Sequence, residues 1–375
     1  MLAALIALLF GGAALAFAGG AATAAPASSL PPDNDNEGDD EGDDETPAAA
    51  SLPASEDTPD LPDSAYALDW DGLTAEEQLI VELVNRARLD PNAEVNRLNE
   101  GLASGIDPAP KQALAVLSEL SDAARAHSAD MDDRNFFDHE NPDGQSPGDR
   151  AVDAGHDTPY VGENIAVIGS SWTDFDEQAR AEDLHDGLWE SDGHQRNMLS
   201  ESWTEIGTGY DYGNWEGYAG STFVTEKFSA GPETYLTGVV IEDADGDDFY
   251  DMGEGQGGVR VTATDEANPE NVYTTSTWEA GGYTLALPSG IYRVRFEGGD
   301  LDAPQEALVT IDSDNVKLDI IDETSSTGIF ASATLVPEDG TEDAAMLPSL
   351  PPVEDSDGLA LDASEDEDDI EPMLL

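Results

Sequence analysis

The chain has 375 residues, which is enough for two domains and terminal segments. Its 14 lysines and arginines and its 82 aspartates and glutamates give a formal net charge of −68. This charge excludes nucleic acid as a natural partner and disfavours docking onto anionic lipid, because both need a basic surface. The chain holds no cysteine, which excludes disulfides, thiolate metal sites and a cysteine nucleophile.

Both ends differ in composition from the middle of the chain. Residues 1–25 are small and apolar, long enough to span a bilayer, and end in residues that suit signal-peptide cleavage. No lysine or arginine precedes this run, so a cleaved signal, a retained anchor and a misplaced start codon all stay open. Each of them places the rest of the chain outside the cytoplasm, so we expect a secreted or cell-surface-anchored protein. Residues 26–67 and 323–375 are rich in acids and poor in apolar residues, which predicts disordered segments.

Residues 68–232 form the first predicted domain. Residues 73–88 have helical periodicity, with Thr74 and Glu77 spaced as a capping box and Pro91 as the expected stop. Residues 114–134 and 175–191 predict two further helices, and residues 135–144 a loop rich in turn residues. Residues 206–212 and 218–228 alternate as two strands of a hairpin. Helices first and strands later indicate an α+β fold.

This region contains a series of short motifs. They include Phe-Asp-His-Glu-Asn-Pro-Asp-Gly at 137–144, Gly-Glu-Asn-Ile-Ala at 162–166 and Ser-Asp-Gly-His at 191–194, with further motifs at 84–88, 126–131, 150–155, 188–199, 206–209 and 224–228. In sequence and in order, over about 160 residues, they resemble the CAP superfamily in its bacterial form, also called the SCP-like extracellular domain. The resemblance implies an α-β-α sandwich.

The resemblance also implies a cleft with two histidines and two acidic residues. By motif, His139 and His194 match the two histidines and Glu163 matches one acid. The fourth position is open between Glu190 and Asp192. Imidazole nitrogen and carboxylate oxygen are zinc ligands, so Zn²⁺ in this cleft is one expectation. General acid–base work by a histidine is the alternative.

The remaining histidines have plainer interpretations. His127 lies on a predicted helix among alanines and is expected in packing or beside the site. His156 and His185 lack a motif, so they are expected on the surface.

Residues 235–322 form the second predicted domain. Six alternating segments predict strands at 235–241, 258–263, 282–287, 290–296, 306–311 and 316–320. No helical pattern interrupts them, which favours a small all-β sandwich. The segments at 238–261 and 282–294 resemble the SD-repeat B-like and Cna-B-like accessory domains of bacterial surface proteins.

An acidic loop lies within this second domain. Five carboxylates occupy positions 1, 3, 5, 9 and 12 of a twelve-residue loop, namely Asp243, Asp245, Asp247, Asp251 and Glu254. This is the oxygen-ligand spacing of an EF-hand calcium loop, although the flanking elements are strands and the turn glycine is displaced to Gly246. The loop predicts Ca²⁺ binding, with a solvated acidic turn as the alternative.

Three functions are compatible with these features. The first is an extracellular binding protein whose His/Glu cleft takes a divalent metal and an unidentified envelope ligand such as a lipid, with the sandwich as a calcium-stabilised accessory domain. The second is an extracellular metal-dependent hydrolase that uses the same cleft. The third is a structural envelope protein. No serine stands in a nucleophile motif and His-Glu-x-x-His is absent, which favours binding over catalysis.

Overall fold

The computed structural model describes residues 70–322, 327–331 and 370–374. The predictions for residues 1–25 and 26–67 lie outside these residues, and so does the prediction for residues 323–326, 332–369 and 375 of the tail. Up to residue 230 the elements are α1 (Ala75–Leu89), α2 (Pro91–Leu98), β1 (Ala115–Val116), α3 (Ser118–Arg134), α4 (Pro147–Asp153), β2 (Gly162–Ser170), α5 (Glu177–Glu190), α6 (Asp192–Met198), β3 (Glu205–Trp215) and β4 (Tyr218–Ser229). The later elements are β5 (Tyr235–Ile241), β6 (Val259–Asp265), β7 (Val272–Ser276), β8 (Gly282–Ala286), β9 (Gly290–Gly298), β10 (Gln305–Ile311), β11 (Val316–Asp322), β12 (Thr327–Ala331) and β13 (Ile370–Leu374).

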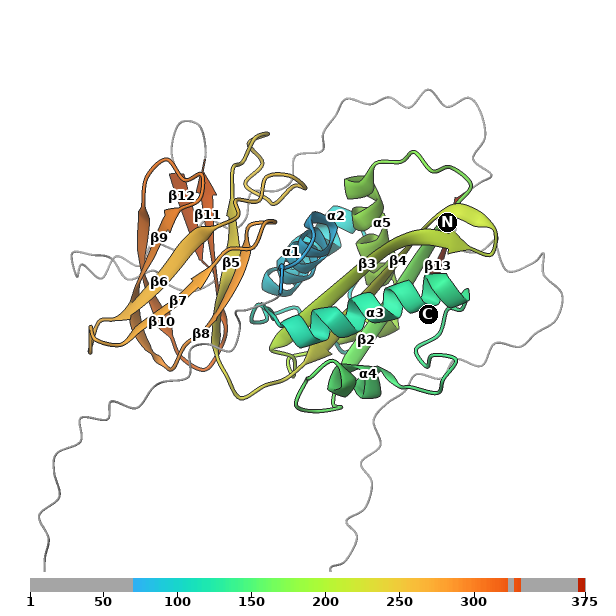
Figure 1. Cartoon of the computed structure of the whole chain (residues 1–375), viewed down its shortest axis with the longest axis horizontal. Coiled ribbons are helices and arrows are strands. Elements are labelled where there is room, and N and C mark those ends of the chain that lie inside the picture. Colours follow the sequence, from blue (N-terminus) through green and yellow to red (C-terminus); the bar gives the residue numbers. More distant parts are fainter. Residues whose placement is uncertain (1–69, 323–326, 332–369, 375) are drawn as a thin grey trace, which may run out of the picture. The chain divides into compact units, whose positions relative to one another are not determined.

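The first region has three layers, as predicted. Its sheet has the order β1-β3-β4-β2-β13, and α3 crosses one face of it (Figure 1). Gly207 and Gly209 let α3 lie directly on β3, since a Cβ at either position would come 2.2 Å from the backbone of α3. On the other face, Ile206 joins the hydrophobic cluster of α1 and α5, and Thr208 donates to the carbonyl of Glu77 on α1. The α-β-α arrangement therefore follows from alternate residues of one strand facing two helical layers.

Most predicted elements are present, with several differences. Thr74 and Glu77 form the capping box of α1, but Pro91 opens α2 instead of only ending a helix. The helix predicted from residue 114 begins at Ser118, because Ala115 and Val116 pair in parallel with β3. Elements α4, β2 and α6 were not predicted.

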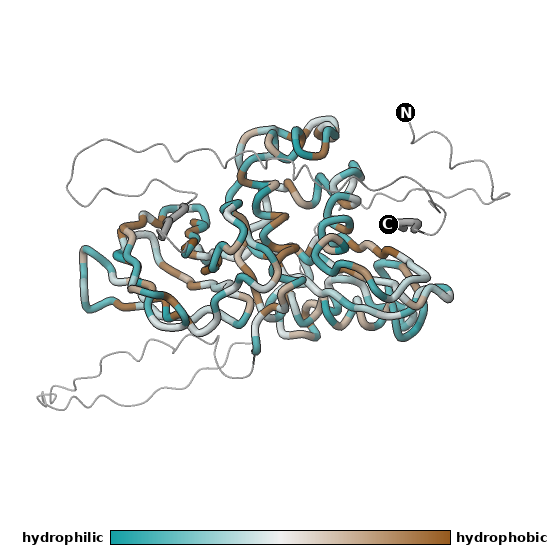
Figure 2. Tube along the Cα trace, turned by 90° about the horizontal axis from the view of Figure 1, so that it is seen from above, coloured by the Kyte–Doolittle hydropathy of each residue, from teal (hydrophilic) through white to brown (hydrophobic). Residues whose placement is uncertain are grey.

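The second region is a β-sandwich, as predicted. Its two sheets have the orders β10-β9-β6-β7 and β12-β11-β5-β8, with β5 and β11 parallel. A separate hydrophobic cluster fills the space between these sheets and includes Val261, Phe296 and Leu318. Figure 2 shows that hydrophobic segments lie within the strands and helices, whereas the peripheral loops are hydrophilic.

The sandwich and the first region contact one another across α1. Val239, Ile241 and Ile321 belong to the same hydrophobic cluster as the apolar residues of α1. Lys317 Nζ lies 2.8 Å from the carboxylate of Glu82, and Trp278 Nε1 donates to Gln78. These contacts bury polar residues on the side of α1 that faces the sandwich.

Two strands lie in the range 323–375, for which the sequence predicted an acidic disordered tail. Strand β12 pairs antiparallel with β11, and β13 pairs antiparallel with β2 from Ile370 opposite Ser170 to Leu374 opposite Ala166. Residues 327–331 and 370–374 of this range are thus paired as strands. Strand β12 pairs with β11, the strand directly before it in the chain. Strand β13 instead depends on the open edge of β2, about 200 residues earlier, which no local pattern reveals. Pro372 within β13 is compatible with its position at the edge of the sheet.

Candidate functional site

Glu163 and its neighbours come from four separate elements. Glu163 is the second residue of β2 and lies directly opposite Lys227 on β4. Arg150 comes from α4, and His139 from the loop between α3 and α4. The side chain of Asn141 fixes this loop by accepting hydrogen bonds from the backbone N–H groups of residues 143 and 145. The structure therefore brings together residues that lie up to about 90 positions apart.

The Glu163 carboxylate is surrounded by cationic and imidazole groups. Arg150 donates to both carboxylate oxygens at 2.9 and 3.0 Å, and Lys227 Nζ lies 2.5 Å from Oε2. His139 Nδ1 lies 2.9 Å from Oε1, and His127 Nε2 lies 3.8 Å from the same oxygen. Burial alone would raise the pKa of Glu163, but Lys227, His139, His127 and Arg150 together hold it well below its usual range. Glu163 is therefore ionised at neutral pH.

Burial has the opposite effect on the basic groups beside Glu163. It lowers the pKa of Lys227 despite the attraction of Glu163, and it lowers the pKa of His127 to about 4. His127 is thus neutral at physiological pH and fully buried. It packs near Phe136 with a ring-centroid separation of 5.9 Å, which agrees with the predicted place beside the site.

His139 differs from these groups because its side chain is 41% exposed. An ionised carboxylate at Nδ1 accepts the proton of that nitrogen, so the neutral ring keeps its lone pair on Nε2. A carboxylate that fixes a histidine in this way is the usual partner of a metal-binding imidazole. The pair therefore offers one oriented nitrogen as a metal ligand or hydrogen-bond acceptor.

His194 lies on α6, which packs against the start of β2. The backbone oxygen of His194 accepts a 3.4 Å hydrogen bond from Asn164, and Asn197 donates to the backbone oxygen of Glu163. In the described part of the chain, two groups of three residues each offer one possible metal-ligand atom per residue, with all three atoms within 4.8 Å of one another. His139, Glu163 and His194 do not form such a group. The structure thus pairs His139 with Glu163 without adding His194 as a third ligand.

Neither candidate for a fourth ligand lies in a buried site. Asp192 has a 78% exposed side chain and lies 3.5 Å from Arg196, and Glu190 is exposed.

The acidic loop does bring three of its five carboxylates together. Asp243, Asp245 and Asp247 form one of the groups with ligand atoms within 4.8 Å. Asp251 instead accepts a hydrogen bond from Gln178 on α5, and Glu254 accepts from backbone N–H groups of the loop itself. Burial and neighbouring carboxylates raise the pKa of Asp247, and raise those of Asp251 and Glu254 to about 6. A cation would relieve this repulsion.

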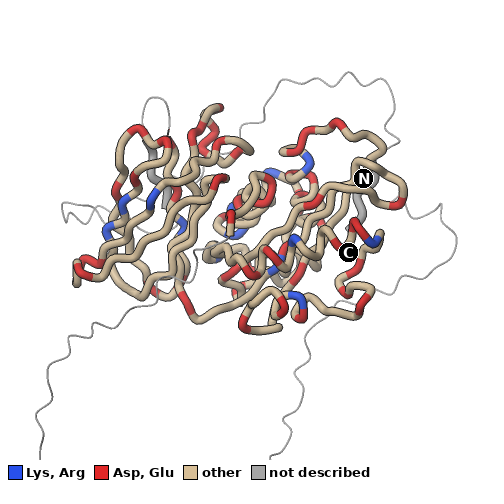
Figure 3. The backbone as a smooth tube through the Cα atoms, in the orientation of Figure 1, with Lys and Arg blue, Asp and Glu red and all other residues tan. Residues whose placement is uncertain are grey.

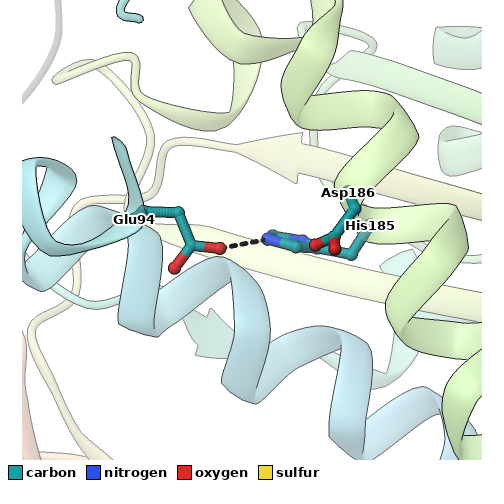
Figure 4. A group of neighbouring side chains, drawn as sticks. All are labelled: Glu94, His185 and Asp186. Atoms are coloured by element: carbon teal, nitrogen blue, oxygen red, sulfur yellow. Dashed lines mark hydrogen bonds and ion pairs between the residues drawn. The ribbon is translucent and has the colours of Figure 1, made fainter. Parts of the chain in front are cut away.

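The second such group was missed by sequence reasoning. Glu94 on α2 and His185 and Asp186 on α5 converge, with His185 Nε2 at 3.2 Å from Glu94 (Figure 4). His185 is fully buried, so the prediction of a surface position was wrong. Arg86 and Arg97 both bind the Glu94 carboxylate, and Arg97 also binds Asp186. Two arginines thus neutralise two carboxylates, which leaves no net negative charge to attract a metal ion.

A serine, a histidine and a glutamate also meet, again unpredicted. His156 Nε2 lies 3.1 Å from Ser229 Oγ, and Ser229 donates to Glu205. The His156 side chain is only 8% exposed, contrary to the expected surface position, and Ser229 is fully buried. A substrate cannot reach this hydroxyl, so the group is structural.

One cavity of about 60 Å³ lies between α1 and the sandwich, away from His139. Glu82, Arg86, Phe249 and Lys317 are among the residues that line it. A volume of this size holds a few water molecules.

Comparisons with known proteins agree on the first region. Residues 81–228 match the model of the CAP family, described as the cysteine-rich secretory protein family, although this chain has no cysteine. The Bacillus subtilis (strain 168) protein YkwD is 33% identical over 138 residues, which are 37% of this chain and 43% of YkwD. The match thus spans less than half the length of this curated relative.

Two solved structures show a lower similarity. An extracellular SCP-domain protein of Bacillus anthracis (strain Ames) is 27% identical with a TM-score of 0.27, over 42% of this chain and 40% of that one. An outer surface protein of Borrelia burgdorferi is 11% identical with a TM-score of 0.28, over 42% of this chain and 93% of that one.

Proposed function

Since residues 81–228 contain a CAP (SCP-like) domain, we propose that this chain is an extracellular binding protein whose ligand contacts His139. The observation that supports this proposal is the pair formed by half-exposed His139 and buried Glu163. Glu163 is anchored by Arg150 and Lys227, so it holds the imidazole in place without itself being available to a ligand. The proposed binding end of the cleft is therefore the Nε2 atom of His139.

Zinc binding through His139 is part of this proposal. His139 Nε2 supplies one free ligand, whereas a catalytic zinc site needs three from the protein. We therefore expect zinc to bind weakly through His139, with any remaining positions filled by water or by the ligand. The alternative of a metal-dependent hydrolase has no supporting observation, because the pair of His139 and Glu163 offers one ligand nitrogen where a catalytic zinc needs three protein ligands.

We propose calcium binding by the sandwich loop at Asp243, Asp245 and Asp247. Support comes from the convergence of the three carboxylates and from the raised pKa of Asp247. The role of this region as an SD-repeat B-like accessory domain is part of the same proposal.

Secretion is proposed from two features. The matching family is described as secretory, and residues 1–25 are apolar and small. In the part of the chain that the structure describes, no helix is both long and apolar enough to cross a membrane. Residues 1–25 lie outside that part.

Zinc titration of the full chain tests the proposed cleft. Excess calcium is present throughout, so that acidic surface sites are occupied. Wild-type protein is compared with His139→Ala, with His194→Ala and with Glu140→Gln, which removes an exposed carboxylate from the same loop. We expect heat of binding for the wild type and Glu140→Gln, and its loss in His139→Ala. Equal zinc binding by His139→Ala would contradict the proposal, and loss in His194→Ala would add a second ligand.

A second titration addresses the ligand class. Neutral phosphatidylcholine vesicles serve as the lipid probe, since they do not repel a chain of net charge −68. Binding by the wild type that is weakened in His139→Ala would support a lipid ligand, and equal binding by both would contradict it.

A further inference from the structure

The two sheets of the sandwich have different outer faces. The outward residues of β5 and β11 pack against α1, as Val239 and Ile321 do. On the other sheet, alternate residues of β10, β9, β6 and β7 point away from the sandwich core and lie side by side in register. We call these residues the outer Arg/Glu face: Arg260, Thr262, Thr264, Val272, Thr274, Ser276, Ile291, Arg293, Arg295, Glu297, Glu306, Leu308 and Thr310.

This face has a charge unlike that of the chain. It holds three arginines and two glutamates, so its formal charge is 3 − 2 = +1, whereas the chain has −68. Three of the chain's 14 basic residues therefore lie on one face. Figure 3 shows basic residues within the strands of the sandwich and acidic residues mainly in the loops at their ends.

The face also exposes aliphatic side chains between its charges. Val272 is 51% exposed and Ile291 is 44% exposed, and both are among the large hydrophobic residues most open to solvent in the described chain. Arginine, glutamate and exposed aliphatic groups on a flat sheet suit a protein contact better than a small ligand.

Opposite charges alternate across this face. Arg295 lies 3.0 Å from Glu297 and also pairs with Glu306 on the neighbouring strand, while Arg293 lies 3.0 Å from Glu266. Exposed pairs of this kind contribute little, so exchanging their partners costs little. A face that carries both arginines and glutamates can exchange these pairs with the glutamates and arginines of a second copy.

We propose that the outer Arg/Glu face is the contact surface for a second copy of this chain. Two chains of charge −68 repel each other in most orientations, and the repulsion is smallest where a face of charge +1 meets its equal. Four strands of about seven residues present roughly 19 Å by 23 Å, or about 440 Å² per partner. Since a stable dimer buries about 800 Å² per partner, we expect a weak, concentration-dependent dimer.

Sedimentation velocity of the full chain over a wide concentration range tests this proposal. The main variant is Arg293→Glu with Arg295→Glu, which changes the formal charge of the face from +1 to 1 − 4 = −3. The matched control is Arg134→Glu with Arg196→Glu on the first region, which lowers the total charge of the chain by the same four units. A third variant, Ile291→Ser, removes apolar contact at constant charge. Circular dichroism confirms that each variant is folded.

The proposal expects reversible dimers of the wild type. The dimer dissociation constant should rise about tenfold or more in the face variant, since like charges then oppose each other, and should rise in Ile291→Ser. It should change much less in the control. A wild type that stays monomeric at all concentrations would overturn the proposal, and so would equal weakening by the face variant and the control.

Discussion

Replacing Glu163 by glutamine removes a carboxylate that lies against two buried cations. Lys227 is fully buried and Arg150 nearly so, and both contact the Glu163 carboxylate within 3.0 Å. Removing one partner of a buried ion pair costs about 3–5 kcal/mol, because the remaining charge is left uncompensated. For a chain of this size the loss corresponds to a fall in melting temperature of roughly 6–20 °C, measurable by calorimetry.

The pH dependence of this variant follows from Lys227. Burial already lowers the pKa of Lys227, and losing Glu163 removes the group that opposes the shift. A lysine whose pKa is lower in the folded state binds more protons when unfolded, so stability rises with pH over that window. The deficit of Glu163→Gln should therefore shrink as the pH rises from 7 towards the ordinary lysine pKa of about 10.4.

Glu226→Gln is the matched control. Glu226 is the neighbour of Lys227 on β4 and is also fully buried, but burial raises its pKa, so it already favours the neutral form. Glutamine should cost little there, because its amide oxygen can still accept the hydrogen bond from Asn164. If the two variants lose equal stability, or if the Glu163→Gln deficit does not depend on pH, the description of Glu163 as an anchored counter-ion is refuted.

Three other outcomes are expected. Gly209→Ala should lower the free energy of unfolding in urea by about 1–3 kcal/mol or more, since its Cβ would come 2.2 Å from Arg125 N. Gly193→Ala should not lower it, because a Cβ at that position meets open space. Similar stability losses in both variants would contradict the close packing of α3. Calcium should raise the melting temperature of the full chain, and Asp245→Ala with Asp247→Ala should abolish the rise, whereas a persisting rise would exclude the loop. Without calcium, the pKa values of Asp251 and Glu254 are raised to about 6 in the folded loop. The folded loop therefore binds more protons than the unfolded chain between about pH 4 and 6. Stability should therefore fall as the pH rises through that window, and saturating calcium should remove the fall.

The elements that could be predicted from the sequence are those determined by nearby residues. The capping box of α1 joins residues three positions apart, and the hairpin of β3 and β4 follows from alternation on both sides of a short turn. The strands of the sandwich are likewise bounded by local glycine and proline signals. Strand β1 was taken as the start of a helix because its pairing with β3 lies about 90 residues away.

The site was predicted only in part for the same reason. His139 and Glu163 were found by motif, and the structure brings them together. The two cations that anchor Glu163 lie in the family-like segments 150–155 and 224–228, but nothing in these segments connects them to Glu163, since Lys227 follows 64 residues later on another strand. His185 was predicted on the surface because nothing nearby in sequence indicated its buried partner. That partner is Glu94, whose carboxylate also binds two arginines.

The central claim is that Glu163 holds the His139 ring with its lone pair on Nε2. Nitrogen NMR of the full chain labelled with ¹⁵N-histidine tests it most directly, with the His139 signal assigned from its loss in His139→Ala. We predict that the neutral ring of His139 carries its proton on Nδ1 and none on Nε2, with Nε2 as the histidine nitrogen that shifts most when zinc is added. A neutral ring with its proton on Nε2, or a zinc shift confined to other histidines, would contradict the account.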